Sequence, residues 1–458
     1  MNVSTLLLLI AALAVAGYYQ GSSRAVTVAA PLGGVRRLPS LPAHYGAYVA
    51  LMVLLPALAA VLVWSLASAP LIERLVLASL PASHAGADAG LLLNSIANLA
   101  AGGATGDTDP VLVSAAERMA SLGQRSLLGM WALAVACALL GGFRAWRRVR
   151  ADFVARNVVE HIFTRLLFAC ACVAVLTTIG ILLSVVIESL RFFQMVSPVE
   201  FFFGLEWSPQ IALRADQQGS SGRFGAVPLF TGTLLISAIA LLVAVPVGLM
   251  SAIFLSEYAS AKLRSRLKPL LEILAGIPTV VYGFFAALTV APLVREFGTA
   301  IGLEASSESA LAAGLVMGVM IIPFVSSLSD DILHAVPLSL RDGSLALGST
   351  RSETIKRVVI PAALPGIVGG VLLAASRAIG ETMIVVMAAG LSARLSANPF
   401  ESVTTVTVQI VTLLVGDQEF DSPKTLAAFA LGLVLFVVTL ALNIFALHIV
   451  RKYREQYE

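Results

Sequence analysis

Long uninterrupted apolar runs dominate this sequence and leave it few possible folds. Nine stretches are predominantly apolar over 17 residues or more, and a helix of about that length crosses a hydrocarbon core of about 30 Å. Inside lipid every backbone polar group needs a partner within the protein, and these runs lack the alternation of barrel strands, so helices are the spanning solution. Only 12% of the residues are charged, against roughly 25% in an average soluble domain. The sequence therefore predicts an all-α integral membrane protein, with spans at residues 3–19, 47–72, 127–143, 162–187, 229–255, 269–294, 309–328, 362–390 and 425–450.

Basic residues are distributed unevenly between the two sides of these spans. With the N-terminus outside, the segments 20–46, 144–161, 256–268, 329–361 and 451–458 lie in the cytoplasm and hold 19 of the 30 Lys and Arg residues, whereas the opposite segments hold 9. Cytoplasmic loops carry the excess of Lys and Arg. The expected protein is therefore multi-pass, with an external N-terminus and a cytoplasmic C-terminus. The first run has no Lys or Arg before Arg24, so it is expected to stay as a helix rather than to be a cleaved signal peptide.

A basic stretch, Arg144–Arg150, separates three N-terminal helices from six C-terminal ones. We take it as a boundary between an N-terminal membrane extension, residues 1–151, and a core, residues 152–458. Residues 73–126 are rich in Ala, Gly, Ser and Asp, most clearly in Gly102–Asp109. This composition favours a flexible external loop within the extension.

The cytoplasmic segment 329–361 carries the most informative pattern. Residues Leu340–Pro361 are helical in propensity and are interrupted by Gly348, with apolar residues on both sides of it. The pattern predicts two short helices joined by a turn, a surface suited to docking. It resembles the coupling loop by which permeases of binding-protein-dependent ABC importers contact their ATPase. Four residues fall in register with that loop (Gly348, Val358, Ile360 and Pro361), whereas Asp342, Gly343 and Ser344 stand where the family has Glu-Ala-Ala.

Gly343 is the notable departure from the family pattern. Glycine within a helix costs about 1 kcal/mol relative to alanine. We therefore expect the first short helix of the loop to be weaker, or to begin later, than in the family.

Three further motifs make the resemblance more specific. These are Glu257-Tyr-Ala, the stretch Leu267–Phe285, and Arg377-Ala-Ile-Gly-Glu-Thr-Met383. They look like the Pst-type phosphate permeases, on the PstC side of the subunit pair, over residues 152–458. Membership would imply phosphate as the substrate, a second homologous permease (PstA-like), a cytoplasmic ATPase dimer (PstB-like) and a periplasmic phosphate-binding protein (PstS-like) in the bacterial inner membrane.

Arg377 and Glu381 are two charges within one expected span. Four residues apart on one helix, they would share a face. Intramembrane charges are costly and tend to line a path or a bundle interior, and a guanidinium presents planar donors to phosphate oxygens. The resemblance also makes this pair the expected substrate path, together with Ser376, Gly380 and Thr382. The alternative is a structural ion pair that neutralises itself.

The sequence lacks the motifs that several other functions require. The chain has no Gly-x-x-x-x-Gly-Lys-[Ser/Thr] motif, so ATP hydrolysis is expected on another chain. Its five histidines have no metal-ligand spacing and no nucleophile stands beside a base, so we expect no catalytic residues, metal or cofactor. A net charge of +3 gives no indication of nucleic acid binding. A sulfate or molybdate permease and a proton-coupled secondary transporter remain as alternatives.

Overall fold

The computed structural model describes residues 2–80, 89–101, 110–209, 222–415 and 422–454. The chain divides into two compact units, Met1–Leu176 and Thr177–Glu458. The division falls within one long helix, α5 (Ala155–Met195).

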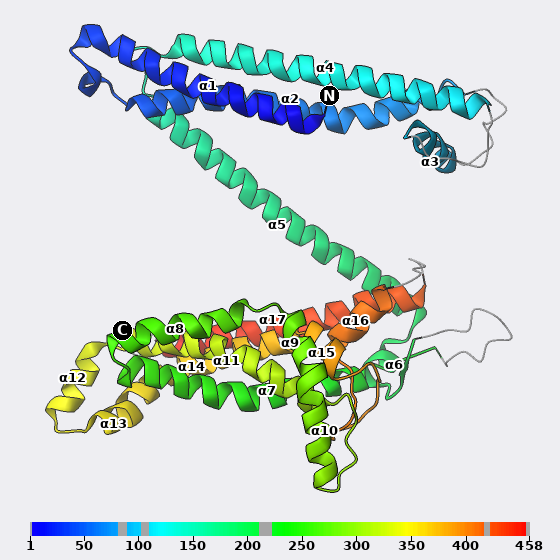
Figure 1. Ribbon diagram of the computed structural model, residues 1–458, viewed down its shortest axis with the longest axis vertical. Coiled ribbons are helices and arrows are strands. Elements are labelled where there is room, and N and C mark those ends of the chain that lie inside the picture. Colours follow the sequence, from blue (N-terminus) through cyan, green and yellow to red (C-terminus); the bar gives the residue numbers. More distant parts are fainter. Residues whose placement is uncertain (1, 81–88, 102–109, 210–221, 416–421, 455–458) are drawn as a thin grey trace. The chain divides into compact units, whose positions relative to one another are not determined.

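The N-terminal unit is built from three long helices that lie along one another (Figure 1). Its elements are α1 (Val3–Ala29), the 3-10 turns η1 (Ala30–Leu32) and η2 (Val35–Arg37), α2 (Pro42–Leu77), α3 (Ala89–Ala100) and α4 (Pro110–Arg148). Small residues allow close packing, because a Cβ atom on Gly141 of α4 would collide with the backbone oxygen of Met52 on α2. Buried alanines and valines fill the space between the three helices.

The expectation of a flexible loop at residues 73–126 is wrong for most of the described residues of this segment. Helix α2 continues to Leu77, α3 lies within the segment, and α4 begins at Pro110. Alanine and leucine are strong helix formers, so their abundance here outweighed the glycines in setting the local structure. The Gly102–Asp109 stretch lies outside the described residues.

The C-terminal unit is a helical bundle with a short two-stranded β-hairpin. After α5 come α6 (Pro198–Phe203), the paired strands β1 (Trp207–Ser208) and β2 (Arg223–Phe224), α7 (Val227–Ile253) with its π-helical end η4 (Phe254–Tyr258), and α8 (Ala261–Gly276). Next are α9 (Thr279–Phe285), the π-turn η5 (Ala286–Val290), α10 (Ala291–Ala300) and α11 (Ala310–Ala335). The last elements are α12 (Leu338–Ala346), α13 (Arg351–Thr354), the π-turn η6 (Ile355–Val359), α14 (Ile360–Ile379), α15 (Met383–Ala388), α16 (Val406–Leu414) and α17 (Pro423–Arg454).

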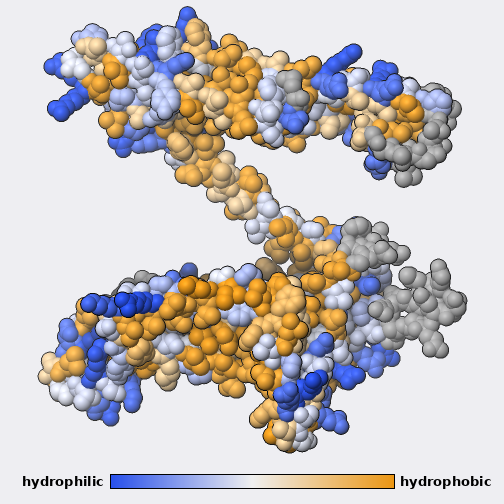
Figure 2. All heavy atoms as spheres, in the orientation of Figure 1, coloured by the Kyte–Doolittle hydropathy of each residue, from blue (hydrophilic) through white to orange (hydrophobic). Residues whose placement is uncertain are grey.

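Helix α11 forms the centre of this bundle and packs along α7. Gly314 and Gly318 lie four residues apart on α11, and a Cβ atom on either would come within 3 Å of an α7 side chain or backbone oxygen. Small residues at this spacing let two membrane helices approach closely. Figure 2 shows hydrophobic residues over the middle of the unit and hydrophilic residues at the end that carries α12 and α13.

In the described part of the chain, nine helices are long and apolar enough to cross a membrane, as the sequence predicts. Two spans were misplaced. The segment 269–294 is not one helix, since α8 ends at Gly276 and the next helix begins at Thr279, after Pro278. The residue before a proline favours extended backbone, and Ile277 has ψ of 129°. Pro278 therefore separates two helices, whereas Pro246 lies inside α7.

The span expected at 362–390 was also wrong. Helix α14 ends at Ile379, and α15 starts at Met383 after a break of three residues. This break contains most of the residues expected to line the substrate path.

Candidate functional site

The segment 329–361 forms a helical hairpin at one end of the C-terminal unit (Figure 1). Gly348 joins its two arms with φ of 89°, a left-handed conformation that glycine adopts without penalty. Thr350 then caps α13, accepting from the Glu353 backbone N–H at 3.3 Å while the Glu353 carboxylate accepts from the Thr350 N–H at 2.9 Å. The predicted turn at Gly348 is thus present, and α12 runs from Leu338 to Ala346 through Gly343.

The residues matched to the coupling-loop pattern take different positions in this hairpin. Asp342 and Gly343 lie on the exposed side of α12, whereas the Ser344 hydroxyl lies 3.0 Å from that of Thr354 and joins the two arms. Val358 and Ile360 are half-buried and Pro361 is exposed in the first turns of α14. The tip presents Leu347, which is 89% exposed, so the hairpin offers an apolar contact point beside its polar residues.

An ion pair holds this hairpin to the end of α7. Arg341 on α12 lies 2.7 Å from the Glu257 carboxylate and donates to the Leu333 carbonyl oxygen at 2.6 Å. Glu257 is buried, and its backbone oxygen accepts from the Arg351 guanidinium. Removing one partner of a buried pair leaves an uncompensated charge and costs about 3–5 kcal/mol. The Glu257 motif therefore fixes the position of both arms of the hairpin.

A second charged group lies beside the first and ties α8 to α11. Asp330 is buried on α11 and accepts from Arg264 at 3.0 Å and from Lys268 at 2.9 Å. The hydrogen bond to Asp330 raises the pKa of Lys268, so this amine stays charged at physiological pH. The His334 Nδ1 lies 2.9 Å from the Asp330 carbonyl oxygen and its Nε2 faces Arg264. The sequence reasoning missed this cluster, because Asp330 and its two basic partners lie more than 60 residues apart in the sequence.

Arg377 and Glu381 do not form the expected pair. Arg377 is exposed on the last turn of α14, with its guanidinium carbon 5.7 Å from the centre of the Phe324 ring on α11. Glu381 lies beyond the end of the helix, where its carboxylate accepts from the Met383 N–H at 3.1 Å. Among the described residues the two charges form no ion pair within 4.0 Å. The expectation of a shared helix face was wrong, because α14 ends between them.

The break between α14 and α15 is held by neighbouring hydroxyls. The Thr407 hydroxyl, near the start of α16, donates to the Glu381 carbonyl oxygen at 2.8 Å. Gly380 is exposed at the end of α14, and Thr382 precedes α15 with its hydroxyl 3.5 Å from the Gly380 oxygen. Ser376 is half-buried one residue before Arg377. Irregular backbone among membrane helices occurs where it is buried in protein or lines an aqueous cavity.

Comparison with known families identifies the class of protein to which this fold belongs. Residues 244–455 match the family described as "Binding-protein-dependent transport system inner membrane component". Residues 7–177 match the family described as "Phosphate ATP-binding cassette transporter". The first of these families defines the class of the bundle and its hairpin: a multi-pass permease subunit of an ABC importer.

Curated relatives narrow the class to one family. The chain is 34% identical over 273 residues to the "Probable ABC transporter permease protein YqgH" of Bacillus subtilis (strain 168), covering 59% of this chain and 84% of the relative. It is 31% identical over 322 residues to the "Phosphate transport system permease protein PstC" of Xylella fastidiosa (strain Temecula1 / ATCC 700964), covering 67% and 92%. The chain belongs to the PstC family of permease proteins.

Solved structures also include similar chains. One is titled "Crystal structure of a bacterial ABC transporter involved in the import of the acidic polysaccharide alginate", with 18% identity, a TM-score of 0.43, and coverage of 65% of this chain and 99% of that chain.

Proposed function

We propose that this permease subunit forms half of the translocation path of a phosphate importer and receives the work of ATP hydrolysis through the hairpin of α12 and α13. The single observation that carries the proposal is the clamped hairpin, in which Gly348 makes the turn and the Arg341–Glu257 pair fixes α12 to α7. A rigid contact of this kind transmits a movement of the docked ATPase into the helix bundle. Relatives at 31–38% identity that are named phosphate transport permeases support phosphate as the substrate.

The partners follow from this role. A second homologous permease (PstA-like) would complete the path, a cytoplasmic ATPase dimer (PstB-like) would dock at the hairpin, and a periplasmic binding protein (PstS-like) would deliver phosphate. The ATP would then be hydrolysed on the ATPase chain alone. The excess of Lys and Arg in the segments on the hairpin's side supports a cytoplasmic C-terminus and an external N-terminus.

Arg377 is the residue proposed to contact the anion. Its exposed guanidinium at the end of α14 is free of any carboxylate within 4.0 Å in the described residues, so its donors are available to phosphate oxygens. Glu381, Ser376, Gly380 and Thr382 complete the proposed site around the break.

The substrate is tested by uptake into vesicles that contain the assembled complex. Labelled phosphate should enter, and excess unlabelled sulfate or molybdate should not compete with it. Competition by either oxyanion as strong as that by phosphate would favour the alternative permease. The same vesicles separate an ATP-driven importer from a proton-coupled carrier, since orthovanadate should stop uptake by the former and leave the latter unaffected.

A further inference from the structure

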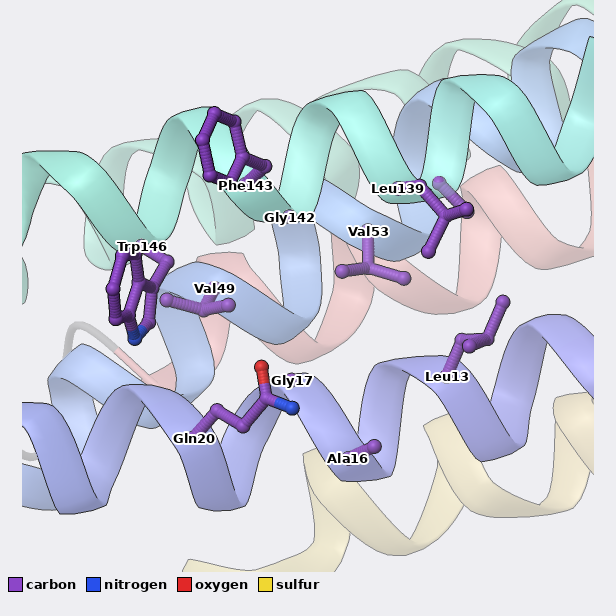
Figure 3. A pocket seen from close by; sticks show the side chains of 11 residues that line it. Leu13, Ala16, Gly17, Gln20, Val49, Val53, Leu139, Gly142, Phe143 and Trp146 are labelled. Carbon is purple, nitrogen blue, oxygen red and sulfur yellow. The ribbon is translucent and has the colours of Figure 1, made fainter.

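The N-terminal unit contains a groove between α1, α2 and α4 with a volume of about 380 Å³ (Figure 3). This volume lies within the range of about 300–1,000 Å³ that is typical of ligand pockets. Leu13 and Leu139 lie at one end of the groove, and Gln20 and Trp146 lie at the other. The groove is therefore apolar along most of its length and polar at a single end.

Two arginines contact the aromatic residues that line the groove. The guanidinium carbon of Arg24 lies 3.7 Å from the centre of the Trp146 ring, and that of Arg147 lies 4.5 Å from the centre of the Phe143 ring. Arg24 is one helical turn beyond Gln20 on α1. Its Nε is buried and has no hydrogen-bond partner among the described residues.

Arginines outnumber carboxylates at this end of the unit, where Asp152 and Glu160 also lie. Residues 1–72 and 118–151 contain no Asp or Glu, whereas the two segments at this end contain seven arginines. These are Arg24, Arg36, Arg37, Arg144, Arg147, Arg148 and Arg150. Within the described residues none of the seven forms an ion pair with a carboxylate, unlike Arg264 and Arg341 in the C-terminal unit. In Figure 2 hydrophilic residues gather at this end of the unit.

We propose that this groove binds an anionic glycerophospholipid. One acyl chain would lie between α1 and α4 along Ala16 and Leu139, and the phosphodiester would lie among Arg24 and Arg147. Basic pockets between membrane helices bind anionic headgroups, and the guanidinium fork matches phosphate oxygens. A phospholipid provides the apolar chain and the anion in one molecule, which matches an apolar groove with arginines beside one end.

Native mass spectrometry of the detergent-purified assembled complex tests this site. The probes are phosphatidylglycerol and phosphatidylcholine with the same acyl chains. The wild-type complex should retain phosphatidylglycerol in preference to phosphatidylcholine. The double substitution Arg24→Gln, Arg147→Gln should lower phosphatidylglycerol retention roughly ten-fold or more. The matched control, Arg118→Gln with Arg125→Gln, removes two arginines of α4 outside the groove and should retain the lipid as the wild type does.

A second variant keeps the arginines and fills the groove. Ala16 is exposed to the groove, so Ala16→Phe should exclude the acyl chain and lower retention without disturbing the core. Equal retention of both lipids, or unchanged phosphatidylglycerol retention in both variants, would overturn the proposal. Retention by the isolated chain but not by the assembled complex would also overturn it, because another subunit would then cover the groove.

Discussion

The two ends of the C-terminal unit differ in how their charges are satisfied. At the hairpin end, Glu257 and Asp330 are buried and each is paired with arginine or lysine. At the far end of α14, Arg377 lies on the last turn, Glu381 lies in the break that follows, and the two do not pair with each other. Buried pairs hold elements in fixed positions, whereas an unpaired cation can exchange water for a ligand. This difference is the reason for proposing a mechanical role for the first group of charges and an anion-binding role for the second.

The largest effect is expected at the unpaired end. Arg377→Gln should abolish phosphate uptake with the complex still assembled, because the substitution removes a cation that supports no buried pair. The measurement is uptake of labelled phosphate in vesicles, normalised to assembled complex. Arg394→Gln is a matched control, since Arg394 is an exposed arginine of the segment after α15. Normal uptake by Arg377→Gln would exclude this arginine from the path.

At the hairpin end, Gly348→Val should uncouple ATP hydrolysis from transport. A non-glycine residue in the left-handed region costs about 1–2 kcal/mol, and β-branched residues are especially disfavoured there. The strain should shift α12 relative to α13, so ATPase activity should no longer respond to substrate-loaded binding protein. Gly343→Ala is the control, because Gly343 lies inside α12 with open space around it. Co-purification with the ATPase and normal uptake by Gly348→Val would contradict the coupling role.

A double-mutant cycle sharpens the difference between the two ends. Arg341→Met alone should leave Glu257 buried without its partner and lower the amount of assembled complex, at a cost of about 3–5 kcal/mol. Adding Glu257→Gln should recover part of that loss, since the uncompensated charge is then gone. Assembly is measured by co-purification of the ATPase. Purely additive losses in the double mutant would show that the pair does not hold the hairpin.

The corresponding cycle at Arg377 and Glu381 should behave differently. Glu381→Gln should preserve assembly and change transport only partly, giving tighter phosphate retention or admission of other anions, because the carboxylate no longer competes for the site. The double substitution should remain inactive, as Arg377→Gln is alone. Recovery of uptake in the double mutant would instead identify a structural pair and remove it from the substrate path.

Hydropathy predicted the helices well because burial in lipid depends on local composition. It could not locate the break after Ile379, since apolar residues lie on both sides and the break is held by Thr407, which is distant in sequence. The Arg341–Glu257 ion pair could not be predicted either, because the two residues are distant in sequence and nothing near either one identifies its partner. The turn at Gly348 was predictable, since the left-handed conformation favours glycine regardless of tertiary contacts.

The smallest effect is expected from removing the N-terminal extension, residues 1–151. The hairpin, the break and their charges all lie in the C-terminal unit, and a chain starting near Ala151 retains α5 whole, since this helix begins at Ala155. Such a chain, given a new insertion signal where needed, should import phosphate at the wild-type rate per assembled complex. It should also lose the preference for phosphatidylglycerol, because the arginine-lined groove is gone. Impaired uptake by correctly inserted and assembled truncated protein would show that the extension takes part in transport, and that the two charged ends of the C-terminal unit are not sufficient for it.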